Sequence, residues 1–163
     1  DLDALLDAID GDPLILVLDG VQDPHNLGAC LRTADAAGVG LVILPKDRSA
    51  PLTPVARRAA SGAADILSIL LATNLARVLQ HLKQRGVWLA GTMDQAEQDL
   101  YAMDLTGPLA LVVGSEGQGM RRLTAELCDH RVRIPMAGTV SSLNVSVATA
   151  VCLFEILRQR SRP

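Results

Sequence analysis

Short apolar runs alternate with helical segments along almost the whole chain, and this alternation constrains the fold more than any other feature. Residues 14–18 form a continuous run of leucine, isoleucine and valine, which is typical of a strand covered on both faces. A helical stretch with an apolar stripe follows at residues 27–37 and ends at Gly38. Strands joined by helices of this length need crossover connections. The sequence therefore predicts an α/β fold with three layers and a mostly parallel sheet.

The same alternation recurs to the end of the chain. It predicts further strands at residues 41–44, 66–71, 87–90, 109–113 and 132–134, and further helices at 54–60, 75–85, 121–128 and 145–160. Residues 1–163 are therefore expected to form a single domain, with residues 1–12 as an acidic N-terminal lead-in.

The predicted helix at residues 145–160 is apolar on nearly all of its sides. Such a helix is expected to be buried on more than one side. In a chain of this length the second side is expected to face a partner subunit, so the sequence predicts a homodimer.

The composition excludes several classes of protein. With 49% hydrophobic and 20% charged residues, the chain is globular and not disordered. No apolar run approaches the roughly 18 residues that span a bilayer, and no leader precedes residue 14, so we expect a cytoplasmic protein with no membrane partner. Cys30, Cys128 and Cys152 form no C-x-x-C pair, and we interpret them as buried, reduced thiols.

The charges are unevenly distributed along the chain. Residues 1–30 hold seven aspartates and no lysine or arginine, whereas residues 31–163 hold 15 basic and 11 acidic residues. A polyanionic partner is therefore permitted along the later part of the chain. The chain has only one Trp, one Tyr and one Phe. This argues against a module that reads single-stranded nucleic acid by stacking bases on aromatic platforms.

Three segments rich in glycine or amide side chains follow predicted strands, at residues 19–26, 114–120 and 135–144. In open parallel sheets, ligands bind beyond the carboxyl ends of the strands. The segments lack the G-x-G-x-x-G dinucleotide fingerprint, the Walker lysine and the G-x-S-x-G nucleophile elbow. No cluster of His, Cys or acidic residues has the spacing of metal ligands, so no metal is expected.

The polar residues of these segments also have ordinary structural explanations. Glu116 lies among three glycines, either as part of a ligand-binding loop or as a solvated glutamate in a strand-to-helix turn. Ser142 and Asn144 precede the last helix, where such residues commonly cap the N-terminus. Arg32 has Asp35 three residues later, which is the spacing of a surface ion pair. The first segment ends at Asn26, a good N-cap for helix 27–37.

Taken together, the segments resemble the three motifs of the SpoU-class RNA ribose methyltransferases, in the same order. The matching stretches are DPHNLGACLR at 23–32, LALVVGSEGQG at 109–119 and IPMAGTVSSLNVSV at 134–147. The resemblance spans about residues 14–160 and implies an α/β fold with a C-terminal trefoil knot. It also implies a homodimer through the helices at 27–37 and 145–160, and S-adenosylmethionine as cofactor. The wording of the motifs is most similar to members that 2′-O-methylate a guanosine in the peptidyl-transferase region of 23S ribosomal RNA.

The resemblance also assigns roles to individual residues of this single catalytic domain. The residues that correspond to the family's functional polar positions are Asn26, Arg32, Glu116, Ser142 and Asn144. The residues expected to contact the cofactor, largely through backbone groups, are Gly114, Ile134, Leu143, Thr92, Gly119 and Met136. Many relatives carry an N-terminal RNA-binding domain, which is expected to have no counterpart in residues 1–163. Two alternatives stay open: a transfer RNA ribose methyltransferase of the same class, and a catalytically silent relative that binds RNA.

Overall fold

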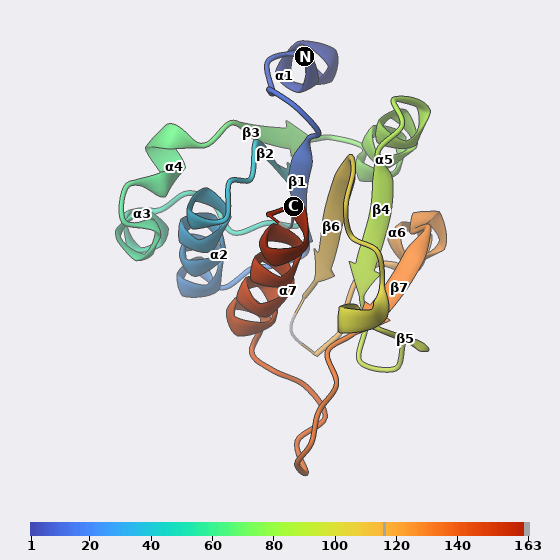
Figure 1. Cartoon of the computed structure of the whole chain (residues 1–163). Helices are drawn as coiled ribbons and strands as arrows, with labels where there is room; N and C mark the ends of the chain where they lie inside the picture. The colour runs from blue at the N-terminus through green and yellow to red at the C-terminus, as the bar shows by residue number, and fades with distance from the viewer. Residues whose placement is uncertain (116, 162–163) are drawn as a thin grey trace.

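Strand β1 (Leu14–Asp19) lies inside the sheet, and all six of its residues are buried. It belongs to a computed structural model that describes residues 1–115 and 117–161. The sheet has the strand order β3-β2-β1-β6-β4-β7-β5, and each of its pairs is parallel (Figure 1). The other strands are β2 (Leu41–Pro45), β3 (Ile69–Ala72), β4 (Trp88–Thr92), β5 (Gln98–Asp99), β6 (Leu109–Gly114) and β7 (His130–Arg133).

Helices cover both faces of this sheet, which confirms the predicted three-layer α/β fold. One face packs against α2 (Pro24–Ala36), α3 (Pro54–Ala60), α4 (Ala63–Ile66) and α7 (Val145–Arg160). The other face packs against α1 (Leu2–Asp7), α5 (Leu75–Gln84) and α6 (Arg122–Leu127). Among the described helices, none combines the length and the apolar character needed to cross a membrane.

Helix α2 makes close contacts with two other helices. A Cβ atom on Gly28 would lie 2.3 Å from the backbone oxygen of Ala56, so α2 and α3 approach at backbone distance. On its other side, the Sγ of Cys30 donates to the Oγ1 of Thr149 on α7 at 3.7 Å. The cysteines are buried thiols, as predicted, and burial raises the pKa of Cys128 to about 11 and that of Cys152 to about 12.

Helix α7 is buried on one side only within the single chain. Thr149, Cys152 and Ile156 face the core and are fully buried, whereas Val147 and Phe154 are about half exposed. The expectation that α7 is buried on more than one side is therefore not met within one protomer. An exposed apolar strip of this kind is what a partner subunit would cover.

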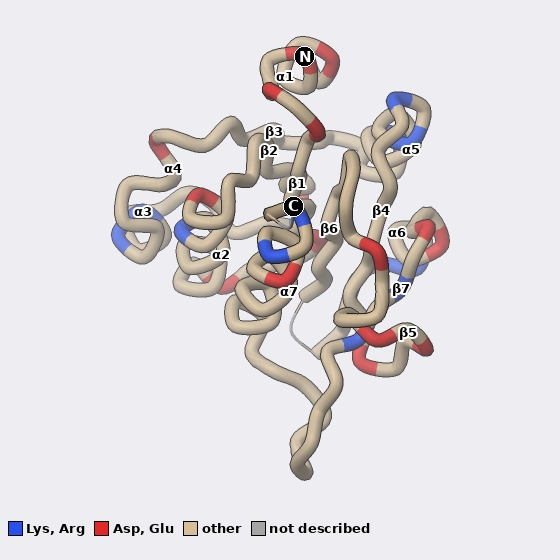
Figure 2. Tube along the Cα trace, in the orientation of Figure 1, with Lys and Arg blue, Asp and Glu red and all other residues tan. Residues whose placement is uncertain are grey.

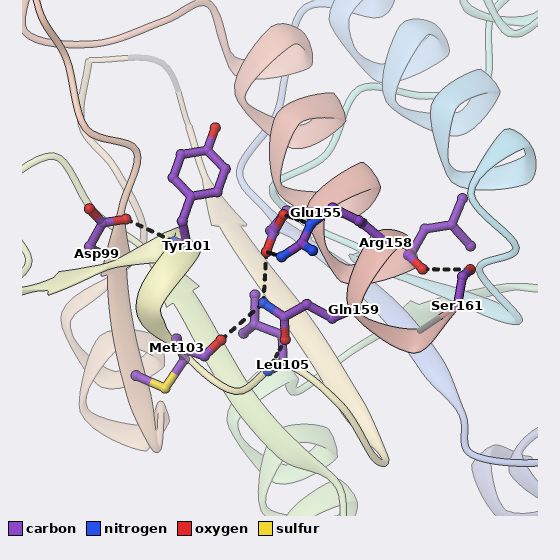
Figure 3. A network of polar contacts seen from close by, with 9 residues as sticks. Asp99, Tyr101, Met103, Leu105, Glu155, Arg158, Gln159 and Ser161 are labelled. Atoms are coloured by element: carbon purple, nitrogen blue, oxygen red, sulfur yellow. Dashed lines mark hydrogen bonds and ion pairs between the residues drawn. The ribbon is translucent and has the colours of Figure 1, made fainter. Parts of the chain in front are cut away.

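Polar side chains near the end of α7 hold the segment that precedes β6. The Nε2 of Gln159 donates to the backbone oxygen of Met103 at 3.0 Å, and its Oε1 accepts from the Leu105 amide at 2.8 Å (Figure 3). The same Nε2 donates to Glu155, whose carboxylate also accepts two hydrogen bonds from Arg158. These bonds fix the segment that follows the short 3-10 helix η1 (Leu100–Ala102) against α7.

Residues 1–12 are more ordered than the predicted lead-in, because they contain helix α1. Acidic residues lie on α1 and basic residues on α5 (Figure 2). The carboxylate of Asp3 lies 2.7 Å from the Nε2 of His81 and 2.6 Å from Arg85, which also binds Asp7. The hydrogen bonds from His81 and Arg85 hold the pKa of Asp3 below its usual value. Leu6 is buried beneath the helix. The acidic segment thus docks on the basic end of α5.

Some predicted elements are wrong in detail. The predicted strand at 66–71 is a helix end followed by β3, since Ile66 closes α4 with its side chain 73% exposed. The last strand covers His130–Arg133 and not 132–134, so Ile134 follows it. Strand β5 and helix η1 were not predicted. The trefoil knot stays a prediction.

Candidate functional site

Neighbouring strands end together at one edge of the sheet and define the site. Because the sheet is parallel, the carboxyl ends of β1, β6 and β4 lie side by side (Figure 1). Asp19 at the end of β1 is in register with Gly114 at the end of β6, and β4 ends at Thr92. The three segments identified from sequence all leave strands at this edge.

The glycine-rich segment after β6 turns back on itself immediately. The amide of Ser115 donates to the Gly119 oxygen, and the amide of Gly119 donates to the Ser115 oxygen, both at 3.0 Å. Gly117 and Gly119 have φ angles of 82° and 70°, a conformation that favours glycine. A Cβ on Gly114 would lie 2.0 Å from the Met120 nitrogen, so only glycine fits there. The predicted functional residue Glu116 lies outside the described residues.

An ion pair with a buried carboxylate anchors this turn to β1. The carboxylate of Asp19 is fully buried and accepts hydrogen bonds from the Arg121 amide at 3.0 Å and from the Arg121 Nε at 3.1 Å. The pair holds the start of α6, and with it the end of the glycine turn, against β1. A buried charge with two charge-assisted hydrogen bonds resists displacement, because breaking them would leave it unpaired.

A cavity of about 670 Å³ opens beside the glycine turn, and a smaller one of about 60 Å³ adjoins it. The predicted cofactor contacts Gly114 and Gly119 line the larger cavity, and Ile134 and Met136 line the smaller one. Thr92 and Leu143 line both cavities. The structure thus brings all of the predicted cofactor contacts together, although they come from three different segments. The larger volume is within the usual range of small-molecule pockets.

Two predicted polar residues also reach these cavities. Ser142 lines both cavities, and Asn144 lines the larger one. Asn144 is in addition the N-cap of α7, where its Oδ1 accepts a hydrogen bond from the Ser146 amide at 2.9 Å. The capping interpretation and a place in the cavity wall therefore both hold for this residue.

The other two predicted polar residues lie on α2, outside both cavity walls. The N-cap of α2 is Asp23, whose Oδ1 accepts from the His25 amide at 2.8 Å, so the expectation that Asn26 is the N-cap is wrong. The helix starts earlier because proline is favourable in its first turn. Arg32 is exposed, and the expected ion pair with Asp35 is absent from the described part of the chain.

Sequence reasoning missed several residues of the cavity wall. Met93 and Asp94 line both cavities, directly after β4. The signal that could have found them is their position, since they follow a strand at the same edge as the glycine turn. The Asp19–Arg121 pair was also missed, because the two residues are 102 positions apart and no pattern connects them.

The wall of the larger cavity includes three glycines of the turn, Gly114, Gly117 and Gly119. Such walls let a ligand approach main-chain amides and carbonyls closely. A family model described as the SpoU rRNA Methylase family matches residues 13–154, which includes all three segments. The chain belongs to the SpoU rRNA methylase family.

Relatives of this SpoU domain support the assignment. The 23S rRNA (guanosine-2′-O-)-methyltransferase RlmB of Pseudomonas syringae pv. tomato is 66% identical over 160 residues, which are 98% of this chain and 64% of the relative. The SpoU domain thus spans somewhat less than two thirds of that relative's length.

Two solved structures share the fold of the SpoU domain. The SpoU methyltransferase AviRb from Streptomyces viridochromogenes, in complex with the cofactor AdoMet, superposes with a TM-score of 0.88 at 30% identity. That match covers 98% of this chain and 64% of AviRb. The TrmH/SpoU tRNA modifying enzyme of A. aeolicus superposes with a TM-score of 0.83 at 32% identity, covering 97% of this chain and 81% of the enzyme.

Proposed function

We propose that this SpoU domain transfers a methyl group from S-adenosylmethionine to the 2′-hydroxyl of a guanosine ribose in 23S ribosomal RNA. The observation that carries the proposal is the convergence of Gly114, Thr92, Leu143 and Ile134 on two adjoining cavities at one sheet edge. The relative from P. syringae, named as a 23S rRNA guanosine 2′-O-methyltransferase, supports the reaction and the RNA class.

The cavity fits the cofactor that the family implies. The space that a Cβ on Gly114 would fill is taken by the backbone of Gly119 and Met120, so the turn is tight. Gly114, Gly117 and Gly119 line the cavity without side chains, so a ligand there can contact the main chain of the turn. The residues that would hold the cofactor are Gly114, Gly119, Thr92, Leu143, Ile134 and Met136. When bound, S-adenosylmethionine supplies a methyl group on a positively charged sulfur, a good leaving group. The AdoMet complex of AviRb, a protein of the same fold, supports this assignment.

The chain's own residues have to orient the ribose and stabilise charge on its oxygen. Ser142 and Asn144 stand in the cavity wall with hydrogen-bonding groups for a ribose. Fixing the hydroxyl in line with the methyl group contributes up to about 7–11 kcal/mol in favourable cases. The backbone walls and the Asp19–Arg121 anchor serve that purpose, since they hold the turn in place.

Arg32 is proposed to stay charged and to stabilise negative charge that develops on the 2′-oxygen. A guanidinium hardly loses its proton in proteins, so it acts as a charge and hydrogen-bond donor and not as a base. Arg32 is exposed on α2 and lies outside the cavity wall of its own chain. This role therefore requires that substrate binding or dimerisation brings the guanidinium to the hydroxyl. Glu116 keeps its proposed role as a polar group of the site, as does Asn26.

We also propose a homodimer through α2 and α7. The two helices pack against each other, and α7 exposes Val147 and Phe154, each close to half exposed. Phe154→Glu would place a charge on this strip and is expected to shift the dimer to monomer in light scattering. Leu123→Glu, at an exposed leucine on α6 on the other side of the sheet, is the matched control and should leave the mass unchanged. A wild-type protein that is monomeric at micromolar concentration would refute the dimer.

Incubation with radiolabelled S-adenosylmethionine and separate pools of ribosomal and transfer RNA tests the function. Label on a 2′-O-methylguanosine of 23S RNA is the expected result. We also propose that the protein works in the cytoplasm. Label on transfer RNA alone would favour the alternative suggested by the tRNA modifying enzyme of A. aeolicus. Binding of RNA with no label on either pool would indicate a silent relative.

The role of Arg32 has its own test. Arg32→Lys keeps the positive charge but removes the planar fork that can hold an oxyanion and a phosphate together. We expect methyl transfer to fall by about tenfold or more while the affinity for S-adenosylmethionine is unchanged. Arg58→Lys, an exposed arginine on α3, is the control. Turnover of Arg32→Lys equal to that of the control would remove Arg32 from the reaction.

A further inference from the structure

The segment between β2 and α3 brings a second arginine to the edge of the sheet where the cavity lies. The amide of Arg48 donates to the Pro45 oxygen at 3.3 Å, directly after β2. Two residues later, the Ala50 amide donates to the backbone oxygen of Val21 at 3.2 Å. The second bond holds the segment against the loop that follows β1. The backbone of Arg48 is therefore fixed by hydrogen bonds at its own amide and at the amide of Ala50.

The Arg48 side chain crosses the end of β1 toward the glycine turn. A Cβ placed on Gly20 would lie 3.3 Å from the Nη2 of Arg48 and 3.4 Å from the Cβ of Ser115. The guanidinium and Ser115 are thus neighbours on the two sides of Gly20. Ser115 lines the larger cavity, so Arg48 stands next to the cavity wall without being part of it. Gly20 itself has a φ of 97°, which favours glycine at this close approach.

Most arginines of the described chain are already engaged. Arg57, Arg85, Arg121, Arg122 and Arg158 bind carboxylates, and Arg131, Arg133 and Arg160 donate to backbone oxygens. Within residues 1–115 and 117–161, no ion pair or side-chain hydrogen bond involves the guanidinium of Arg48. Arg48 is nevertheless half-buried, so its position is set by packing and not by an acid.

The nearby carboxylates do not compete for Arg48. Asp19, at the end of the same strand, is fully buried and accepts from Arg121. Asp23, in the following loop, caps α2 by accepting from the amides of His25 and Asn26. Arg121 and Arg48 therefore differ: Arg121 is paired with Asp19 within the fold, whereas Arg48 keeps an available positive charge.

We propose that Arg48 binds a backbone phosphate of the RNA substrate and so positions the target ribose over the cavity. The inference rests on the proposed function and deepens it by naming a contact on the substrate side. A guanidinium presents two parallel N–H groups that match phosphate oxygens, and its half-buried position limits the loss of side-chain entropy on binding. Phosphate contacts fix the register of a nucleic acid strand without reading its sequence. Arg48 is thus a positioning residue and does not take part in the methyl transfer.

The test compares Arg48→Gln with Arg77→Gln in the full chain, using a transcript of the peptidyl-transferase region of 23S RNA. Arg77 is an exposed arginine on α5, over the other face of the sheet, so its loss changes the net charge equally. Arg48→Gln is expected to raise the KM for RNA about tenfold, with kcat at saturating RNA and the affinity for S-adenosylmethionine unchanged. The negative slope of log affinity against log salt concentration should become shallower by about 0.7, the value for one single-strand phosphate contact.

Arg48→Lys gives a second, independent readout. It keeps the charge and loses the fork, so the wild-type salt slope should return while the KM for RNA is only partly restored. If the wild-type protein methylates the transcript but Arg48→Gln and Arg77→Gln have equal KM values and equal salt slopes, the role of Arg48 is overturned. The proposed function then still stands. A wild-type protein that methylates neither ribosomal nor transfer RNA would overturn the proposed function, and the role of Arg48 with it.

Discussion

The carboxylate of Asp19 holds the main chain and the side chain of Arg121 at the same time, at 3.0 and 3.1 Å. Asp19 ends β1, and Arg121 precedes α6, directly after the glycine turn. This pair connects the most buried part of the sheet to the wall of the candidate cofactor cavity. Stability and ligand binding are therefore expected to depend on the same carboxylate.

Asp19→Asn is predicted to weaken both properties. The substitution removes the negative charge and replaces one oxygen by an amide nitrogen, which cannot accept a hydrogen bond from Arg121. The Arg121 side chain is a third exposed and keeps part of its hydration, so we expect a loss of about 1–3 kcal/mol in the free energy of unfolding by urea. The affinity for S-adenosylmethionine, measured by calorimetry, should fall as the turn loses its anchor. Asp65→Asn, which breaks the exposed Arg57–Asp65 pair, is the control and should have a much smaller effect. Equal stability of the two variants would contradict the anchoring role.

Gly114→Ala is predicted to destroy the cavity wall. The new Cβ would lie 2.0 Å from the Met120 nitrogen and 2.2 Å from the Gly119 carbonyl carbon, so the backbone of the turn must move. We expect a destabilisation of about 3 kcal/mol and loss of cofactor binding in calorimetry. Gly138→Ala is a matched control in the loop before α7, because no atom lies within 4 Å of its Cβ position. Normal cofactor binding by Gly114→Ala would show that the turn is not part of the site.

Asp3→Asn is predicted to lower the melting temperature in a way that depends on pH. His81 and Arg85 hold the pKa of Asp3 below the usual value of 3.8 for an aspartate, so the unfolded state binds the proton more readily. The stabilisation is therefore present above that value and is lost as the pH falls through the lower pKa of the folded state. The difference in melting temperature between wild type and variant should therefore shrink as the pH is lowered from 5 toward 3. A difference that grows on acidification would reverse the assigned sign.

Gln159→Ala is predicted to loosen the segment between η1 and β6. The side-chain amide of Gln159 bridges Met103 and Leu105, and both bonds are lost in the variant. An unpaired, partly buried amide costs about 1–3 kcal/mol, which urea unfolding can measure. Faster hydrogen exchange at the Leu105 amide would localise the effect. Gln80→Ala, at an exposed glutamine on α5, should change neither quantity.

The three thiols are predicted to be unreactive in the native protein. Cys30, Cys128 and Cys152 are buried, and the pKa values of Cys128 and Cys152 are raised to about 11 and about 12. The reactive thiolate is therefore scarce at pH 8. A chromogenic thiol reagent should detect no thiol before unfolding and three after it. Rapid reaction of any cysteine in the folded state would contradict this burial.

Sequence patterns were sufficient where burial is simple. Strands β1 and β6 are covered on both faces, so their continuous apolar runs predicted them closely. The run at 66–71 misled because it joins an exposed helix end at Ile66 to the start of β3. Helix α1 could have been predicted, since Leu2, Leu5 and Leu6 have helical spacing. Strand β5, with two residues, leaves no periodic signal.

In the candidate site, too, local motifs predicted some residues and long-range contacts were missed. The cavity residues were predicted because short motifs carry them, and the structure places those motifs at one edge of the sheet. The pairing of Asp19 with Arg121 and the approach of Arg48 to Gly20 depend on which strands become neighbours. Local sequence does not contain that information, so only the three-dimensional structure reveals these contacts.

The glycine turn has a consequence for how such proteins can diversify. The part of the cavity wall around Gly114, Gly117 and Gly119 offers few side chains to exchange, so substitution can change little at this turn. Under the proposed function, a new RNA target would be acquired more readily through the charged loops nearby, such as the one that carries Arg48. Substrate choice can then change by substitution in the surrounding loops, while the glycine turn that lines the cavity stays the same.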